Sequence, residues 1–210
     1  VVNKELTHKK LVSYIAKIGN KYITKREDYG FEVVFSTSTV PDQGQMMINA
    51  YFDPEEDAEG EVSIEIDLVF HNKDKTIVLS KEGFAWLVNN ILSAITHEMI
   101  HQSQYRSRGH IRGKQFKKYT STSTNVQKAQ KYLGNTDEVE AYGFNIANGL
   151  LINNSYEDAI AFLKNPKKDT MSRSPDLFGY MVAFGFDTNH PIIKRLLTKT
   201  VYYLNKLKNR

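Results

Sequence analysis

The sequence predicts an α+β fold, in which a small mixed or antiparallel sheet packs on one long helix and a helical part completes the chain. Three observations predict it: strand-like runs between residues 31 and 70, a long helical pattern after residue 80, and mostly helical periodicity beyond residue 136. Of the 210 residues 40% are hydrophobic, which is enough for a sizeable buried core. We expect a core domain over residues 1–151 and a helical extension over residues 152–210 that packs on the same domain.

The first element expected is a helix over residues 4–20, because apolar residues recur there at a period of 3.6. Three strands follow, over residues 31–35, 45–52 and 61–70. The third is the clearest, since apolar and polar residues alternate along it, so that one face meets a core and the other meets water or a ligand. Residues 76–79 are expected to close a hairpin with that strand.

A long helix is expected over residues 81–104, with Ser80 as its N-cap. Residues 105–135 are expected to be mostly loop, with a short helix near residues 115–119. A further helix is expected over residues 137–151, capped by Thr136 or Asp137. Another is expected over residues 155–164, with a capping box at Ser155 and Asp158. After a surface connection at residues 165–176, one or two more helices are expected, and the last begins at His190 and Pro191.

Composition excludes several classes of protein. The chain has no Cys, so disulfides, thiol nucleophiles and cysteine-bound metals are excluded, and any metal must be held by His, Asp and Glu. No segment approaches 18 consecutive apolar residues, and the polar N-terminus lacks the apolar region of a signal peptide. We therefore expect no association with a membrane and a cytoplasmic location.

The net charge of +4 hides a segregation of charge along the chain. Residues 53–67 contain eight acidic residues and no basic one, whereas residues 106–131 contain eight basic residues and no acidic one. Solvated faces that attract each other would explain this pattern. A basic surface for nucleic acid over residues 106–131 is the second interpretation. A calcium site in the acidic segment is the least favoured, because the segment lacks the ligand spacing of an EF-hand.

The residues that carry chemistry are His97-Glu98-Met99-Ile100-His101, an HExxH motif on the long predicted helix. His97 and His101 are four residues apart, so both imidazoles lie on one helical face and can bind one Zn²⁺. Glu98 is turned about 100° from His97 and can contact a water on the metal without being a ligand. The metal lowers the pKa of that water toward about 7, and Glu98 can then act as general base.

The predicted orientation of this helix favours a metal site. With Phe84 at zero and about 100° per residue, the apolar stripe spans roughly −60° to +80°, whereas His97 falls near 220° and His101 near 260°. Two histidines of a hydrophobic core would share the face of the stripe instead. Glu98, at about 320°, lies at the border of the polar and apolar faces, where partial desolvation suits a general base.

This segment resembles the active-site helix of the HExxH zinc metallopeptidases, the zincin class. The resemblance covers about residues 80–151 and implies a zincin-like fold, with a mixed sheet packed on the HExxH helix and a third metal ligand from a later helix or loop. It also implies hydrolysis of a protein or peptide substrate. The metzincin subclass is excluded, because it requires a His six residues after His101, where Ser107 stands.

A gluzincin-like site is implied by residues 138–144, Glu-Val-Glu-Ala-Tyr-Gly-Phe, which resemble the ExxA(N/D)xxF signature of ImmA/IrrE-like peptidases. That signature implies Glu138 as the third ligand, although Tyr142 stands where Asn or Asp is usual. Glu140, two positions on, is the fallback. A carboxylate makes the site less positive than a third imidazole would, and Glu138 in the first turn of a helix is stabilised by the helix dipole.

The alternative third ligand is His110, implied by a partial resemblance to SprT-like peptidases at Gly109-His110 followed by Phe116. The spacing to Phe116 is longer than in that family, and Arg106, Arg108 and Arg112 disfavour a cation nearby. Two tyrosines, Tyr105 and Tyr142, are less favoured candidates for stabilising an oxyanion.

The other histidines, His8, His71 and His190, are expected at exposed, turn or helix-cap positions. By analogy with zincin sheets, the strand at residues 61–70 is a candidate edge for an extended peptide.

Two functions are therefore weighed. The first is a zinc peptidase, with Zn²⁺ held by His97, His101 and Glu138 and with Glu98 as general base. The second is a non-catalytic, metal-stabilised virion or nucleic-acid-associated binding protein, favoured by the basic segment 106–131. The whole chain loosely resembles small HExxH proteins of tailed phages, which implies the host cytoplasm or the virion. The oligomeric state has no sequence signal.

Overall fold

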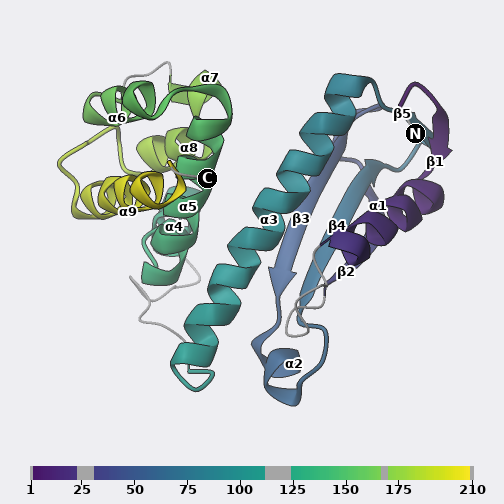
Figure 1. Cartoon of the computed structure of the whole chain (residues 1–210), viewed down its shortest axis with the longest axis horizontal. Helices are drawn as coiled ribbons and strands as arrows, with labels where there is room; N and C mark the ends of the chain where they lie inside the picture. The colour runs from purple at the N-terminus through teal and green to yellow at the C-terminus, as the bar shows by residue number, and fades with distance from the viewer. Residues whose placement is uncertain (1, 23–30, 112–123, 167–169, 209–210) are drawn as a thin grey trace. The chain divides into compact units, whose positions relative to one another are not determined.

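A computed structural model describes residues 2–22, 31–111, 124–166 and 170–208 (Figure 1). The fold is α+β, as expected, with small sheets early in the chain and helices after them. The chain divides into two compact units, Val1–His110 and Ile111–Arg210. The boundary between these units lies earlier in the chain than the boundary expected after residue 151. Residues 136–151 fall in the second unit because they belong to a helix that packs on the last helix of the chain.

The first unit holds a three-stranded mixed sheet and a two-stranded antiparallel one. In the larger sheet β4 (Ile64–His71) lies in the centre, parallel to β2 (Glu32–Ser38) and antiparallel to β3 (Met46–Phe52). The smaller sheet pairs β1 (Glu5–Thr7) with β5 (Thr76–Val78). Small sheets of this kind bury one face against helices, and here the helices are α1 and α3.

The core of the first unit follows from the alternation along β4. Ile64, Ile66, Leu68 and Phe70 are all buried and pack with apolar residues of α1 (His8–Tyr22) and α3 (Lys81–Ser107). Figure 1 shows α3 lying along β3 and β4, and α1 beside β2. On the opposite face of β4 Glu65 is exposed but Val69 is buried, so the expected separation of an apolar and a polar face holds only in part.

Strand pairing differs from the expectation in two ways. The segment at 76–79 does not close a hairpin with β4, because both edges of β4 are already paired with β2 and β3. It forms β5 and pairs with β1. Residues 5–7 therefore form a strand, although a helix was expected over residues 4–20. For the same reason β4 offers no edge to an extended peptide, so the proposed role of residues 61–70 in β-augmentation was wrong.

The acidic segment contains a short helix, α2 (Pro54–Glu59), for which the sequence analysis named no element. Asp53 caps it, since its carboxylate accepts hydrogen bonds from the backbone N–H groups of Glu55 and Glu56 at 2.8 and 3.3 Å. Pro54 occupies a first-turn position, and Gly60 ends the helix with a φ of +80°.

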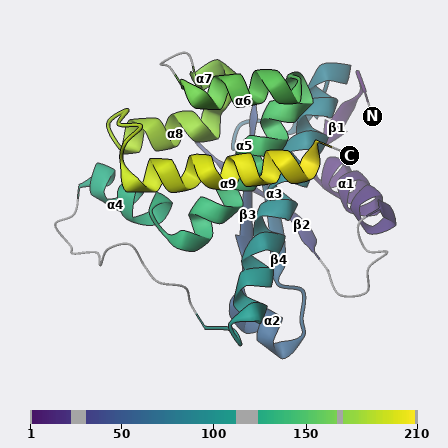
Figure 2. The ribbon, with the colours of Figure 1, turned by 60° about the vertical axis from the view of Figure 1, so that its left-hand side comes forward.

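The second unit is helical throughout its described residues. Its elements are α4 (Asn125–Leu133), α5 (Thr136–Asn153), α6 (Tyr156–Lys164), α7 (Thr170–Arg173), α8 (Pro175–Ala183) and α9 (Pro191–Leu207). Figure 2 shows α9 lying across α5. The two helices approach closely at Gly143, where an added Cβ would lie 2.8 Å from Cβ of Lys199. A buried core that includes Leu150, Tyr180 and Leu196 holds the helices together.

Several helix boundaries confirm the expectations and others correct them. Ser80, Ser155 and His190 cap α3, α6 and α9 as expected, whereas the cap of α5 is Asn135 rather than Thr136 or Asp137. Two helices were missed: α4, which begins with a capping box at Thr124 and Gln127, and α7, inside the expected connection. The helix expected near residues 115–119 lies outside the described residues. In the described part of the chain, no helix combines the length and apolar character needed to cross a membrane.

Candidate metal centre

Helix α3 places the two histidines of the HExxH motif side by side. Nε2 of His97 lies 3.2 Å from Nε2 of His101, and both residues are buried. The ring centroids are 4.8 Å apart at an interplanar angle of 78°. Two nitrogens bound to one tetrahedral Zn²⁺ at about 2.0–2.1 Å lie about 3.3–3.4 Å apart, so the observed separation suits a shared metal.

Gln104 determines which nitrogen of His101 carries a proton. Its Oε1 lies 3.1 Å from Nδ1 of His101. A carbonyl oxygen can only accept a hydrogen bond, so Nδ1 is the donor and Nε2 of the neutral ring keeps its lone pair. The lone pair lies on the His97 side, as a metal ligand requires, and outer partners of this kind orient the ligating ring.

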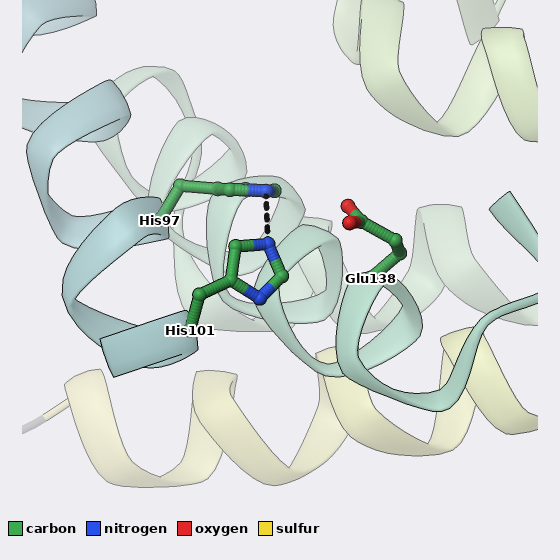
Figure 3. Close-up of side chains that lie close together, drawn as sticks. All are labelled: His97, His101 and Glu138. Atoms are coloured by element: carbon green, nitrogen blue, oxygen red, sulfur yellow. Dashed lines mark hydrogen bonds between the residues drawn. The ribbon is translucent and has the colours of Figure 1, made fainter. Parts of the chain in front are cut away.

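Glu138 completes the set of ligand types. One ligand atom from each of His97, His101 and Glu138 lies within 4.8 Å of the others, and all three residues are buried (Figure 3). Within the described residues this is the group of His, Asp and Glu side chains that can hold a metal ion. Two imidazoles and one carboxylate are a common ligand set of catalytic zinc, and they leave a fourth position for water. The residues present therefore fit the metal expected from the sequence.

Glu98 follows His97 directly on α3 and is only 9% exposed. Its burial beside the two histidines is what the helical wheel indicated.

Three tyrosines of the second unit surround Glu138. Tyr132 and Tyr180 both lie close enough to Glu138 and to Tyr142 for these groups to act on their hydroxyls. The ring of Tyr142 packs edge-on against that of Tyr180, with 5.4 Å between centroids. Burial, and then the negative charge of Glu138, raise the pKa of both Tyr132 and Tyr180 well above the ordinary value. These hydroxyls therefore stay protonated and neutral.

The fallback ligand Glu140 lies in different surroundings. Its Oε1 accepts hydrogen bonds from Nζ of Lys199 at 3.0 Å and from the Tyr203 hydroxyl at 3.2 Å. Both partners lie on α9, so Glu140 takes part in the packing of α5 on α9. Of the two carboxylates, the structure brings Glu138 and not Glu140 to the histidines.

The alternative ligand His110 is hydrogen-bonded to Asp57 instead. Nε2 of His110 donates to Oδ2 of Asp57 at 3.0 Å. The chain reaches this position because Gly109 and His110 both adopt left-handed backbone conformations, with φ of +61° and +63°. This turn ends α3 and is closed by a 2.7 Å hydrogen bond from the His110 N–H to the Tyr105 carbonyl.

Asp57 is the centre of a second polar cluster, which ties α2 to the end of α3. Its side chain is inaccessible to solvent and accepts hydrogen bonds from Gln102 Nε2 at 2.6 Å and from Arg106 Nε and Nη2 at 3.0 and 2.8 Å. The Ser63 hydroxyl donates a further bond at 3.2 Å. Burial alone would raise the pKa of Asp57, but the bonds from Arg106, Gln102 and His110 outweigh it and hold the pKa below its ordinary value.

The charge segregation therefore has a partial explanation within the first unit. Asp53 caps α2 and Asp57 pairs with Arg106, which agrees with the interpretation of opposite charges that attract each other. Of the basic segment proposed for nucleic acid, residues 112–123 lie outside the described residues.

Gln104 and Asp57 were not singled out from the sequence. Gln104 stands three residues after His101, a helical spacing that could have indicated it. Asp57 acts through contacts between different elements and carries no such signal. Of the tyrosines considered for an oxyanion, Tyr142 lies in the cluster beside Glu138, whereas Tyr105 packs on Phe52 with 5.4 Å between ring centroids.

The other histidines have structural surroundings. His8 was expected at an exposed or turn position but is buried, stacked on Phe70 with 3.9 Å between ring centroids. Burial lowers its pKa, and Asp74 opposes this shift. His71 accepts a hydrogen bond from the Lys73 N–H at 3.2 Å, and His190 caps α9.

Comparisons of the chain with known protein families, with curated proteins and with solved structures find no match. The functional interpretation of this site therefore depends on its residues and their geometry.

Proposed function

We propose that this protein is a zinc-dependent peptidase with a zincin-like fold. The observation that carries the proposal is the buried group of His97, His101 and Glu138, whose ligand atoms lie within 4.8 Å of one another. Glu98 stands beside this group on the same helix. A mixed sheet that packs on α3 agrees with the architecture implied by the resemblance.

Each side chain has a distinct role in the proposed reaction. A Zn²⁺ bound here would supply a Lewis acid that polarises a carbonyl and lowers the pKa of water. His97 and His101 would each offer one ring nitrogen to the ion, and Glu138 would contribute a carboxylate whose negative charge offsets part of the charge of the cation. Glu98 takes the proton of the attacking water and passes it to the leaving amine of the peptide.

Zinc is favoured over other ions by the types of ligand. Ca²⁺ and Mg²⁺ prefer sets of six or more oxygen ligands, which two imidazoles and one carboxylate do not provide. Among transition metals, imidazole also binds nickel, copper and iron, but a set of three ligands that leaves one position open is typical of catalytic zinc.

The test compares wild type with Glu98→Gln and with Glu82→Gln, an exposed glutamate in the first turn of the same helix. Each protein is loaded with zinc and incubated with a library of peptides, and new termini are identified by mass spectrometry. We expect Glu98→Gln to keep about one zinc per chain and to lose at least about 100-fold in rate, which is the usual contribution of a general base. Glu82→Gln should cleave like wild type.

Two outcomes would contradict the proposal. Undiminished cleavage by Glu98→Gln would overturn the role of Glu98. Zinc binding by wild type without cleavage of any peptide would favour the non-catalytic, metal-stabilised protein instead.

A further inference from the structure

We infer that the exposed face of α9 binds a single-stranded nucleic acid, with basic side chains against the phosphates and Tyr202 as a surface on which a base stacks. This face lies wholly within the second unit, and its role does not depend on the proposed metal centre. It is also distinct from the basic segment 106–131, since it is carried by the last helix of the chain.

Positive charge on this face is not balanced by carboxylates. Residues 191–208, which form α9 and its C-cap, contain five basic residues and no acidic one. The basic residues are Lys194, Arg195, Lys199, Lys206 and Lys208. Lys199 pairs with Glu140 at 3.0 Å, whereas in the described part of the chain none of the other four has a carboxylate within salt-bridge distance. Unbalanced cations of this kind attract a polyanion.

The four unbalanced cations share one side of the helix. With Tyr202 at zero and about 100° per residue, they span roughly −120° to +40°, and all four are exposed. Arg195 donates a hydrogen bond to the Thr136 hydroxyl at 3.4 Å, which leaves its charge unneutralised. At about 1.5 Å per residue, Lys194 and Lys208 are separated by about 21 Å, the length of about six nucleotides at roughly 3.4 Å each.

Tyr202 gives this face an aromatic surface. It is 45% exposed, and Nζ of Lys206 and Nζ of Lys199 lie 4.6 and 5.8 Å from its ring centroid. Tyr203 packs edge-on against it with 5.1 Å between ring centroids, and the Tyr203 hydroxyl is itself bonded to Glu140. The ring of Tyr202 is therefore supported from within the second unit while part of it stays open to solvent, beside cations that can bind a phosphate.

A second lysine–tyrosine pair lies beside the last turn of α9. Nζ of Lys208 lies 5.1 Å from the ring centroid of Tyr156, the first residue of α6. The Tyr156 hydroxyl donates a hydrogen bond to Oδ1 of Asn205 at 2.7 Å, which holds this ring against α9. Aromatic rings thus alternate with cations along the second half of the helix.

This combination of charge and rings favours a single strand over other polyanions. A duplex offers its phosphates but keeps its bases stacked on one another, so the tyrosines would have no base to contact. An acidic protein or an anionic membrane would engage the cations and leave the rings without a stacking partner. A single strand uses both features, because every base has a face that stacks on an aromatic side chain.

The experiment measures binding of a fluorescein-labelled oligodeoxythymidylate of about 15 nucleotides by fluorescence anisotropy, between about 50 and 200 mM salt. Each phosphate contact on a single strand contributes about −0.7 to the slope of log K against log salt, so Lys194→Gln combined with Lys206→Gln should reduce the slope by about 1.4. Lys9→Gln combined with Lys10→Gln, an equal change in charge at exposed positions of α1, should leave the slope unchanged. Because all four positions are exposed, both double variants should fold, which thermal unfolding checks.

A second pair of variants tests stacking. Tyr202→Ala should weaken binding of the single strand at least about 5-fold, the low end for the loss of one stacked base. Tyr14→Ala, which replaces a 38% exposed tyrosine of α1, should bind like wild type. A duplex of the same length should bind more weakly than the single strand and should not respond to Tyr202→Ala.

Three outcomes would overturn the inference. Equal slopes for the two double variants would mean that the charge of the whole chain, and not this face, causes binding. Full affinity in Tyr202→Ala would remove the role of stacking. Displacement of the oligonucleotide by polyglutamate or by vesicles of anionic phospholipid, as effectively as by unlabelled oligonucleotide, would assign the face to an acidic protein or to a membrane instead. Each of these outcomes would leave the peptidase proposal standing.

Discussion

Nδ1 of His101 donates a hydrogen bond to Oε1 of Gln104 at 3.1 Å, and this bond leaves the Nε2 lone pair of the same ring on the side of His97. One glutamine, a turn further along α3, thus selects the tautomer that a metal ligand needs.

Replacing Gln104 should therefore weaken metal binding without removing a ligand. We expect Gln104→Ala to lower zinc affinity about 10–100-fold, whereas Gln104→Glu, which keeps an acceptor, should retain wild-type affinity or exceed it. Ser103→Ala, an exposed change on the same turn, is the matched control. Competition with a chelator measures all four proteins, and an Ala variant that binds like wild type would show that the bond has no influence on the metal.

The three candidates for the third ligand can be separated by the same assay. Glu138→Gln should lose at least about 100-fold in zinc affinity, more than the loss of an outer partner costs. Glu140→Gln should bind zinc normally, because its carboxylate is engaged by Lys199 and Tyr203. His110→Ala should also bind zinc normally, since His110 pairs with Asp57. Loss of zinc with His110→Ala alone would instead assign the site to the SprT-like arrangement.

The buried carboxylate of Asp57 should stabilise the first unit. We expect Asp57→Asn to cost about 2 kcal/mol in the free energy of unfolding, since it weakens several hydrogen bonds to an inaccessible group. The estimate is at the low end because the Arg106 side chain is 40% exposed and partly solvated. Urea denaturation provides the measurement, with Glu56→Gln, an exposed neighbour on α2, as the control.

The stabilisation by Asp57 should also depend on pH. The pKa of Asp57 is lower in the folded chain than its ordinary value of 3.8. The folded state therefore binds the proton less tightly than the unfolded state, and the stabilisation is complete above the unfolded pKa and lost as the pH falls through the folded one. The difference in stability between wild type and Asp57→Asn should be constant from pH 5 to 7, to within about 0.5 kcal/mol, and shrink below about pH 4. A difference that persists unchanged at lower pH would contradict the assigned pairing.

The close approach of α5 and α9 at Gly143 predicts opposite effects for two similar substitutions. Gly143→Ala would place a Cβ 2.8 Å from Cβ of Lys199 and 3.3 Å from its backbone carbon, so the helices must separate. We expect a loss of about 1–3 kcal/mol, typical of overpacking. Gly149→Ala, on the same helix with no atom within 4 Å, should instead gain up to about 1 kcal/mol from helix propensity. Thermal unfolding distinguishes the two, and equal effects would mean that the contact is not close.

Much of the candidate site could be predicted because its main signals are local. The spacing of His97 and His101 places both rings on one face of any α-helix, and Ser80 marks where that helix begins. Glu138 was found through its position in a motif that opens the next long helix, and Glu140 was separated from it only when Lys199 and Tyr203 were located. Alternation along residues 61–70 likewise predicted which face of the strand is buried.

Long-range pairing could not be predicted from these patterns. The period of a strand states which side chains share a face, but not which strands lie on either side. In the folded chain β2 and β3 occupy the two edges of β4, and β5 pairs with β1. The partners of Asp57 come from 45 and 49 residues along the chain, so no local pattern connects them.

The sequence by itself determined the HExxH helix, the residue types available to a metal, and the exclusion of cysteine chemistry, because each depends on composition or on the geometry of one helix. Only the tertiary structure groups Glu138 with the two histidines and gives Asp57 its buried polar partners. The physical reason is that helical periodicity acts over a few residues, whereas burial and hydrogen bonding of a charged group depend on elements that the fold brings together from distant parts of the chain.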